Sequence, residues 1–450
     1  MGFALAGLLC GGAGARAQAP AQNQAHAAPS GQPVILTLDE AIRRAESSDV
    51  SYASAVAVER TAALDRNIAY GNLLPSVVYH NQGLYTQPNG LLNQAGQGVS
   101  AQPAPRFIAN NAVREYASQA SVDETLGVAK AATVLRAQAL AAQADAEREI
   151  ARRGLVAAVV ALFYQSIAAD HKQTTAESSL RDAAEFTKLT QEREQAREAA
   201  HADAIKAELV EQQRTRELQD ARAAAEKARL ELGVLLFADP RTAFALSAPK
   251  TPPALASRED VAAAAAKNNP ELRSALDALA ASNAGVMAAW GAYLPDLGLN
   301  YTYGIDAPQF AANGPDGVRN LGYSAMVTVD IPLWNWFNTQ RRVKQSKIAR
   351  NVAKVSLDAT QRQLIARLDE AYTEAATARD ELASLDLSVQ TAAESLRLTR
   401  MAYANGEATV LEVVDAQNTY VAAGNAREDG RVRYETARAN LQTLTGTMEP

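Results

Sequence analysis

Apolar residues alternate with small or polar residues in four short segments of the chain. This period of two is typical of a strand with one apolar and one polar face. The alternation is strict in the later pair of segments and noisier in the earlier pair. Segments of about ten residues also match the length that crosses a bilayer at a tilt. The four predicted strands cover about 76–86, 114–124, 296–306 and 322–332.

Two long stretches without proline predict long helices. They lie between Pro105 and Pro240 and between Pro332 and Pro450, and both are rich in Ala, Gln, Glu, Arg and Leu. These residues are good helix formers. Each stretch needs one break, because a single helix would be implausibly long. The breaks leave ~65–70 residues before and ~35 after, or ~100 Å and ~50 Å of helix.

The break in the second stretch has a clear local signal. Gly406 can adopt the positive φ that ends a helix, and Thr409 with Glu412 forms a T-x-x-E cap that starts the next one. The corresponding break, near residues 197–203, lacks a glycine. We expect a helical turn at both places.

A shorter helix is predicted before each pair of strands. Thr37 with Glu40 and Ser257 with Asp260 are capping signatures. Each helix is expected to run about 35 residues, until a Leu-Pro pair ends it. These pairs lie at 74–75 and 294–295.

The same order of elements is written twice along the chain. The capping signatures recur 220 positions apart, as do the Leu-Pro pairs, and the ends of the second strands recur 207 apart (Val122 and Val329). We therefore predict two tandem repeats, 34–245 and 254–448.

The fold class predicted is mainly α with a membrane β-barrel part. Two short helices stacked end to end match one long helix, which gives an antiparallel helical shaft with a four-strand unit at one end. Four strands cannot close a membrane barrel alone, since single-chain barrels begin at eight. We expect oligomeric closure, with four strands from each subunit; a small soluble sheet with one buried face is the alternative.

The N-terminus resembles a secretory signal peptide. Residues 1–17 contain a short apolar run and then small residues, and residues 18–33 are a flexible leader rich in Ala, Gln and Pro. Cys10 is a candidate for lipid acylation, which Leu9 before it disfavours. We find no apolar run of eighteen residues, so strands rather than helices are expected to cross a membrane.

Charge and composition exclude several classes of protein. The chain has 44 Lys+Arg against 50 Asp+Glu, and its net charge of −6 argues against binding nucleic acid. A single Cys and four His without ligand spacing disfavour a metal site. No cofactor is expected.

Two groups of side chains are candidates for function, and each has a plainer explanation. Glu412 and Asp415 follow the Gly406 break; they can simply stabilise a helix N-terminus, or form an acidic ring in a symmetric oligomer. An aromatic cluster follows the last strand and fits either a membrane-interface girdle or the packing of a strand-to-helix corner. The cluster contains Trp334, Trp336 and Phe337.

With these motifs in order, the sequence resembles the TolC-like outer-membrane efflux protein family. The resemblance is carried by the doubled T/S-L-D-E-A type opening, Leu-Pro followed by a strand in both halves, Val-Asp-Ile-Pro-Leu-Trp, and residues 403–417 around the second turn. It covers about 34–448.

The resemblance implies a homotrimer with a 12-stranded outer-membrane barrel and a periplasmic α-helical tunnel. It further implies outer-membrane lipid around the strands, and a periplasmic adaptor and an inner-membrane transporter as partners. Glu412 and Asp415 match acidic positions at the periplasmic entrance, Asp203 is their first-repeat counterpart, and Tyr403 matches a tyrosine that constrains the entrance. Two departures are Ala408, where the well-known member of the family has an arginine in its closing network, and Arg197, where a turn glycine is expected.

Three functions remain open at this point. The first is a passive export duct without catalysis, located in the outer membrane with a large periplasmic part. The second is a periplasmic coiled-coil adaptor without a pore, against which the doubled pattern argues. The third is an enzyme, which would require a pocket that gathers His171 or His201 with carboxylates.

Overall fold

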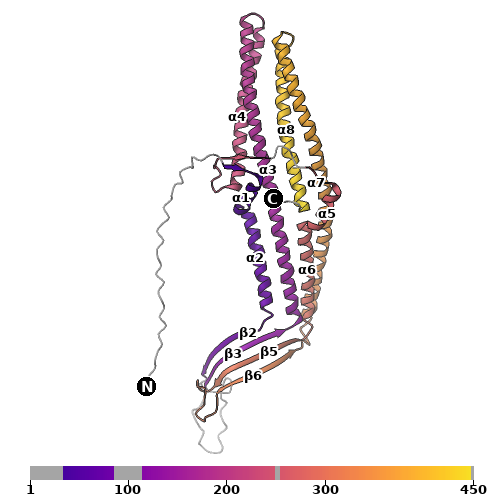
Figure 1. Cartoon of the computed structure of the whole chain (residues 1–450). Coiled ribbons are helices and arrows are strands. Elements are labelled where there is room, and N and C mark those ends of the chain that lie inside the picture. The colour runs from indigo at the N-terminus through magenta and orange to yellow at the C-terminus, as the bar shows by residue number, and fades with distance from the viewer. Residues whose placement is uncertain (1–33, 86–113, 249–253, 447–450) are drawn as a thin grey trace, which may run out of the picture.

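The computed structural model describes residues 34–85, 114–248 and 254–446. The predicted signal peptide, the leader and Cys10 lie outside these ranges. The described chain is mainly helical, and its helices form a long shaft with a four-stranded sheet at one end (Figure 1). In chain order the elements are β1 (Val34–Leu36), α1 (Leu38–Ser48), α2 (Val50–Gly71), β2 (Ser76–Tyr85), β3 (Arg114–Leu126), α3 (Val128–Gln195), α4 (His201–Leu236), β4 (Phe244–Leu246), α5 (Arg258–Asn268), α6 (Pro270–Gly291), β5 (Asp296–Ala307), β6 (Leu321–Asp330), α7 (Asn338–Ala404) and α8 (Val410–Thr445).

The two opening helices are each broken once, contrary to the prediction of one 35-residue helix. Asp49 separates α1 from α2, and its carboxylate accepts a hydrogen bond from Tyr52 N–H at 2.6 Å. Asn269 separates α5 from α6 in the same way, with Leu272 N–H as donor at 2.9 Å. Pro270 follows Asn269, and a residue before proline is pushed out of the helical region. A new N-cap therefore interrupts each helix.

The long helices agree with the prediction. Helices α3 and α7 have 68 and 67 residues, and α4 and α8 have 36 each. The turn between α3 and α4 and the turn between α7 and α8 lie together at the end of the shaft far from the sheet (Figure 1).

The four predicted strands form one antiparallel sheet in the order β2-β3-β5-β6. Strand β3 pairs with both β2 and β5, so that Ala120 lies between Tyr79 and Tyr303. A second sheet, in which β1 and β4 pair in parallel near the middle of the shaft, was not predicted. Its three-residue strands are too short for alternation to be visible in the sequence.

The helices lie side by side in an open layer. In the half near the sheet the order is α2-α3-α6-α7, and in the far half it is α4-α3-α8-α7 (Figure 1). Helices α3 and α7 run the whole length. One margin of the layer is formed by α2 and α4, the other by α7, and β2 and β6 are the corresponding margins of the sheet.

The largest apolar cluster is where α1, β1 and β4 cover α3 and α4. Phe163, Val159, Leu36 and Leu232 are fully buried there. Much of the remaining buried surface along the helices is alanine, which lets helices approach closely.

Helix α3 contains one stretch that is long and apolar enough to cross a membrane. It contains an 18-residue window with a mean hydropathy of 1.3, half of which is buried inside the protein. Val156, Val160 and Phe163 belong to the core described above. Packing against neighbouring helices therefore explains the apolar character of this stretch.

Candidate functional site at the two helical turns

Both turns at the far end of the shaft have the same backbone hydrogen bonds. In the α7–α8 turn, Glu407 N–H donates to Ala402 O at 2.9 Å and Gly406 N–H to Tyr403 O at 3.0 Å. In the α3–α4 turn, Glu198 N–H donates to Arg193 O at 2.8 Å, and Arg197 N–H to Glu194 O at 2.9 Å. This pair of bonds is the Schellman motif, which ends a helix with one left-handed residue.

The left-handed residue differs between the turns. Gly406 has φ 80° and Arg197 has φ 65°. A left-handed conformation strains any residue with a Cβ but not glycine. The turn expected near residues 197–203 is therefore present without a glycine. Arg197 adopts the left-handed conformation there, with strain.

The starts of the following helices also differ. Thr409 caps α8: Glu412 N–H donates to its hydroxyl at 3.3 Å, and the Glu412 carboxylate accepts from Thr409 N–H at 2.6 Å, which confirms the predicted capping box. Helix α4 begins after Ala200, which has no side chain that can cap it. The first turn thus lacks both local devices of the second.

An arginine that sequence reasoning missed joins the two turns. Arg193, in the last turn of α3, donates to Tyr403 O at 2.7 Å and to Ala404 O at 2.6 Å. These carbonyls end α7, where the helix dipole favours a cation. The guanidinium also lies 4.9 Å from the centre of the Tyr403 ring. The only sequence signal was a basic residue shortly before a helix end.

Tyr403 is the centre of a small apolar cluster between the turns. It is 5% exposed, its ring lies 5.0 Å from that of Phe186, and its hydroxyl is 3.3 Å from Thr190 Oγ1. Ala207, Val410 and Val413 complete the cluster. The predicted entrance tyrosine therefore holds the two hairpins together within one chain.

The predicted acidic residues lie near the turns, and each has a different environment. Glu412 is used by the capping box, and the hydrogen bonds from Thr409 hold its pKa below the usual value. Asp415 is exposed, and Asp203 lies 3.5 Å from Lys206 Nζ. The capping explanation of Glu412 is therefore correct for the single chain.

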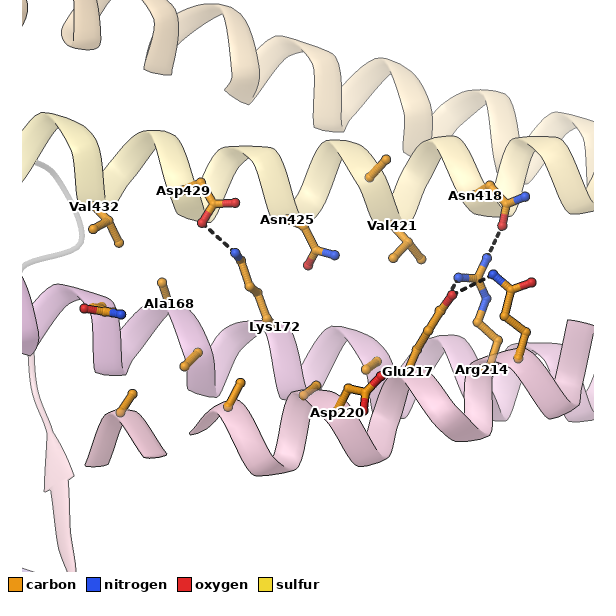
Figure 2. A pocket seen from close by; sticks show the side chains of 18 residues that line it. Ala168, Lys172, Arg214, Glu217, Asp220, Asn418, Val421, Asn425, Asp429 and Val432 are labelled. Atoms are coloured by element: carbon orange, nitrogen blue, oxygen red, sulfur yellow. Dashed lines mark hydrogen bonds and ion pairs between the residues drawn. The ribbon is translucent and has the colours of Figure 1, made fainter. Parts of the chain in front are cut away.

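A groove of about 810 Å³ lies further along the shaft, between the α3–α4 hairpin and α8 (Figure 2). Small side chains, mostly alanines, line much of it. Lys172 pairs with Asp429 at 2.5 Å across the groove (Figure 2). Arg214, which is 4% exposed, pairs with Glu217 at 2.5 Å and also donates to Asn418. These contacts tie α8 to α3 and α4.

Of the histidines in the described ranges, His171 and His201 are not gathered into one reactive site. His171 Nδ1 lies 2.9 Å from Glu428, and His201 Nδ1 lies 2.6 Å from Glu194. Both contacts join two helices, α3 with α8 and α4 with α3. Glu428 also pairs with Arg427 at 3.1 Å, and neither histidine lines the groove described above. Among the described residues, no cluster of three or more His, Cys, Asp or Glu could hold a metal ion.

The aromatic cluster after β6 is exposed. Trp334, Trp336 and Phe337 are 64%, 74% and 56% exposed, and the Trp334 ring lies 5.9 Å from Trp336 and 5.0 Å from Phe337. Trp336 and Phe337 have positive φ angles. The three rings pack on one another at the corner between the sheet and α7.

The sequence and the fold both match outer-membrane efflux proteins. Residues 261–447 match the family model described as outer membrane efflux protein. The outer membrane efflux protein BepC of Brucella suis is 27% identical over 194 residues, which are 41% of this chain and 40% of that protein. The alkaline protease secretion protein AprF of Pseudomonas aeruginosa is 22% identical over 204 residues, 45% of this chain and 41% of that protein. The matches thus span about two fifths of these relatives.

Solved structures extend the likeness to most of the chain. The Campylobacter jejuni CmeC outer membrane channel has a TM-score of 0.74 at 15% identity, covering 91% of this chain and 85% of that one. The Vibrio cholerae outer membrane protein VceC has a TM-score of 0.74 at 16% identity, covering 91% and 96%. Residues 261–447 therefore resemble outer membrane efflux proteins in sequence, and the chain as a whole has the fold of TolC-like outer-membrane channels. The predicted resemblance and the location, in the outer membrane with a large periplasmic part, are confirmed.

Proposed function

We propose that the protein is the outer-membrane duct of a tripartite export system, in which three copies enclose one water-filled path. The observation that carries this proposal is the open layer of helices and strands in the single chain. Its margins, α2 and α4 on one side and α7 on the other, have unsatisfied apolar faces. A closed ring is the arrangement that satisfies every margin with one interface.

Exposed apolar side chains on both margins support ring closure. Val58, Leu64 and Ile68 of α2 are 54–61% exposed, and Val352 and Val355 of α7 are each 65% exposed. Leu64 and Ile68 are four positions apart and Val352 and Val355 three, so each pair lies on one helix face, and exposed apolar surface of this kind marks an interaction site.

The sheet supports the membrane end of the duct. Strands β2 and β6 leave their outer edges unpaired, and exposed edges invite pairing with another chain. Tyr323, Met326 and Val327 of β6 are 57–75% exposed. Four strands from each of three copies would give a 12-stranded barrel, with Trp334, Trp336 and Phe337 at its lipid interface.

The two tandem repeats, 34–245 and 254–448, are part of the same proposal. Their matching helix lengths allow three chains to approximate a ring of six similar units. The signal peptide 1–17, which precedes the leader 18–33, would direct export to the periplasm before assembly.

The turns form the periplasmic entrance in this proposal. Glu412, Asp415 and Asp203 would repeat around the axis as acidic rings that favour cations, and Tyr403 with Arg193 would hold the hairpins of each subunit in place. Gly406 and Thr409 shape the turn. A periplasmic adaptor and an inner-membrane transporter are the partners that the family resemblance suggests, and BepC and AprF are named for efflux and for protein secretion.

Planar-bilayer recording of the purified oligomer tests the duct. We expect discrete conductance steps, and a weaker preference for cations when Glu412→Ala is combined with Asp415→Ala. Protein that assembles and inserts but never conducts would contradict the proposal. A periplasmic adaptor without a pore is the alternative, and it should not fractionate with the outer membrane by its own strands.

A further inference from the structure

Arg153 of α3 joins the two halves of the chain at the middle of the shaft. It is 8% exposed and donates from Nη1 to Thr443 O at 3.0 Å and to Asn268 O at 3.3 Å. Glu149, one turn earlier, accepts from its Nε at 2.8 Å and holds the guanidinium in place. The two carbonyls belong to the last turns of α8 and α5, where backbone oxygens lack partners within the helix.

The same donor pair occurs on α7. When the turn residues Arg197 and Gly406 are superposed, each residue of α3 corresponds to the residue 209 positions further on. Ala183-Ala184-Glu185 then matches Ala392-Ala393-Glu394. Arg153 and Glu149 correspond to Arg362 and Asp358. Within the described chain, Arg362 is exposed and makes no hydrogen bond or ion pair.

The acceptor site also has a counterpart, at the α1–α2 break. Asn269 Nδ2 donates to Leu444 O at 3.1 Å in the second half, and Ser48 Oγ donates to Leu235 O at 2.5 Å in the first. At each break, a side chain thus donates a hydrogen bond to the last turn of the long hairpin that follows in the chain. The carbonyls that correspond to Asn268 O and Thr443 O are those of Ser48 and Val234.

Donor and acceptor lie on opposite margins of the layer. Arg362 is on α7, whereas Ser48 and Val234 are on the α1–α2 and α4 side (Figure 1). They cannot meet within one chain. The exposed fractions of corresponding residues agree with this placement. Ala146 of α3 is fully buried within the chain, whereas its counterpart on α7, Val355, is 65% exposed.

We propose that Arg362, oriented by Asp358, binds the carbonyls of Ser48 and Val234 of a second copy of this chain. The contact repeats between subunits what Arg153 does within one subunit. It rests on the proposed ring, and it names the docking site that sets the register of neighbouring subunits. The occupant is a second copy because the chain already contains the internal version of this contact.

The dissociation of the detergent-solubilised oligomer on dilution tests this contact. Arg362→Ala should raise the dissociation concentration by roughly tenfold or more per interface, because charge-assisted hydrogen bonds are lost. Arg362→Lys should rescue only partly, since a lysine cannot donate to two carbonyls as a planar fork. The matched control is Arg342→Ala, an exposed arginine of α7 that corresponds to the exposed Thr133 of α3. Equal dissociation of Arg362→Ala and Arg342→Ala would overturn the inference.

Cross-linking gives a second, independent readout. In a Cys10→Ser background, subunits carrying only Arg362→Cys are coassembled with subunits carrying only Val234→Cys and treated with a bismaleimide. A cross-linked dimer is expected in the mixture and in neither variant alone. An assembled, conducting mixture without this band would overturn the inference while leaving the duct intact. A wild-type protein that stays a single copy would overturn both.

Discussion

The two turns at the tip of the shaft reach the same backbone geometry by different means. The α7–α8 turn uses local chemistry, with Gly406 in the left-handed position and Thr409 with Glu412 at the next N-cap. The α3–α4 turn has Arg197 and Ala200 at these places. It contributes instead Arg193, which binds the end of α7. The α7–α8 turn thus contains its own stabilising residues, whereas the α3–α4 turn has a strained residue and supplies the arginine that binds its neighbour.

Of the variants that compare the two turns, the replacement of Arg193 should cause the largest loss of stability. Arg193→Ala removes two charge-assisted hydrogen bonds and the contact with the Tyr403 ring, and we expect the free energy that holds the hairpin tips together to fall by about 2 kcal/mol. Hydrogen exchange of the amides around Asn405 measures it. Arg181→Ala, an exposed arginine on α3, is the control. Unchanged protection in Arg193→Ala would mean that the tips do not depend on this contact.

Exchanging the left-handed residues should change stability in opposite directions. Gly406→Ala introduces a Cβ at φ 80° and should destabilise its turn by about 1–2 kcal/mol, whereas Arg197→Gly relieves strain and should stabilise its turn by up to about 1 kcal/mol. Local hydrogen exchange at each turn reports both changes. Two variants that shift protection in the same direction would refute the assignment of strain to Arg197.

The N-caps give a smaller pair of effects. Thr409→Ala should cost about 1 kcal/mol at the start of α8, and Ala200→Ser should stabilise the start of α4 by about 0.5 kcal/mol, since Asp203 is already at the third helical position. Amide protection in the first turn of each helix measures this. No gain from Ala200→Ser would show that the α4 terminus is stabilised by other contacts.

Acid should weaken the α7–α8 turn by the smallest amount. The pKa of Glu412 is lowered by the hydrogen bonds from Thr409, so its stabilisation is present above the usual carboxyl pKa and is lost as pH falls through the lowered value. Exchange at the start of α8, corrected for intrinsic rates, should therefore increase below about pH 4.5. Glu412→Gln should lose most of this dependence; if it does not, another group controls the turn.

The local turn is also the one that could be predicted. The residue types that indicate it, Gly406, Thr409 and Glu412, lie within a few positions of one another. The patterns that predict the strands and the long helices are equally local. The breaks at Asp49 and Asn269 also had local signals, a capping side chain and Pro270, but the prediction extended each helix from its capping signature to the Leu-Pro pair. These two errors concern competing local preferences.

The contacts that hold the site together could not be predicted. Arg193 acts on carbonyls some two hundred positions away, and no residue type in its neighbourhood indicates that it reaches them. The β1–β4 pair likewise joins three-residue segments that are distant in sequence. Such contacts depend on how the two halves of the chain pack against each other. The periodicity of the sequence carries no information about this packing.

The breaks at Asp49 and Asn269 have a mechanical consequence. At the level of these breaks α2 and α6 begin and α4 and α8 end, whereas α3 and α7 continue through it. Bending of the shaft at this level therefore needs no loss of helical hydrogen bonds in α2, α4, α6 or α8. Such bending must be taken up by α3 and α7, whose helical hydrogen bonds continue across this level.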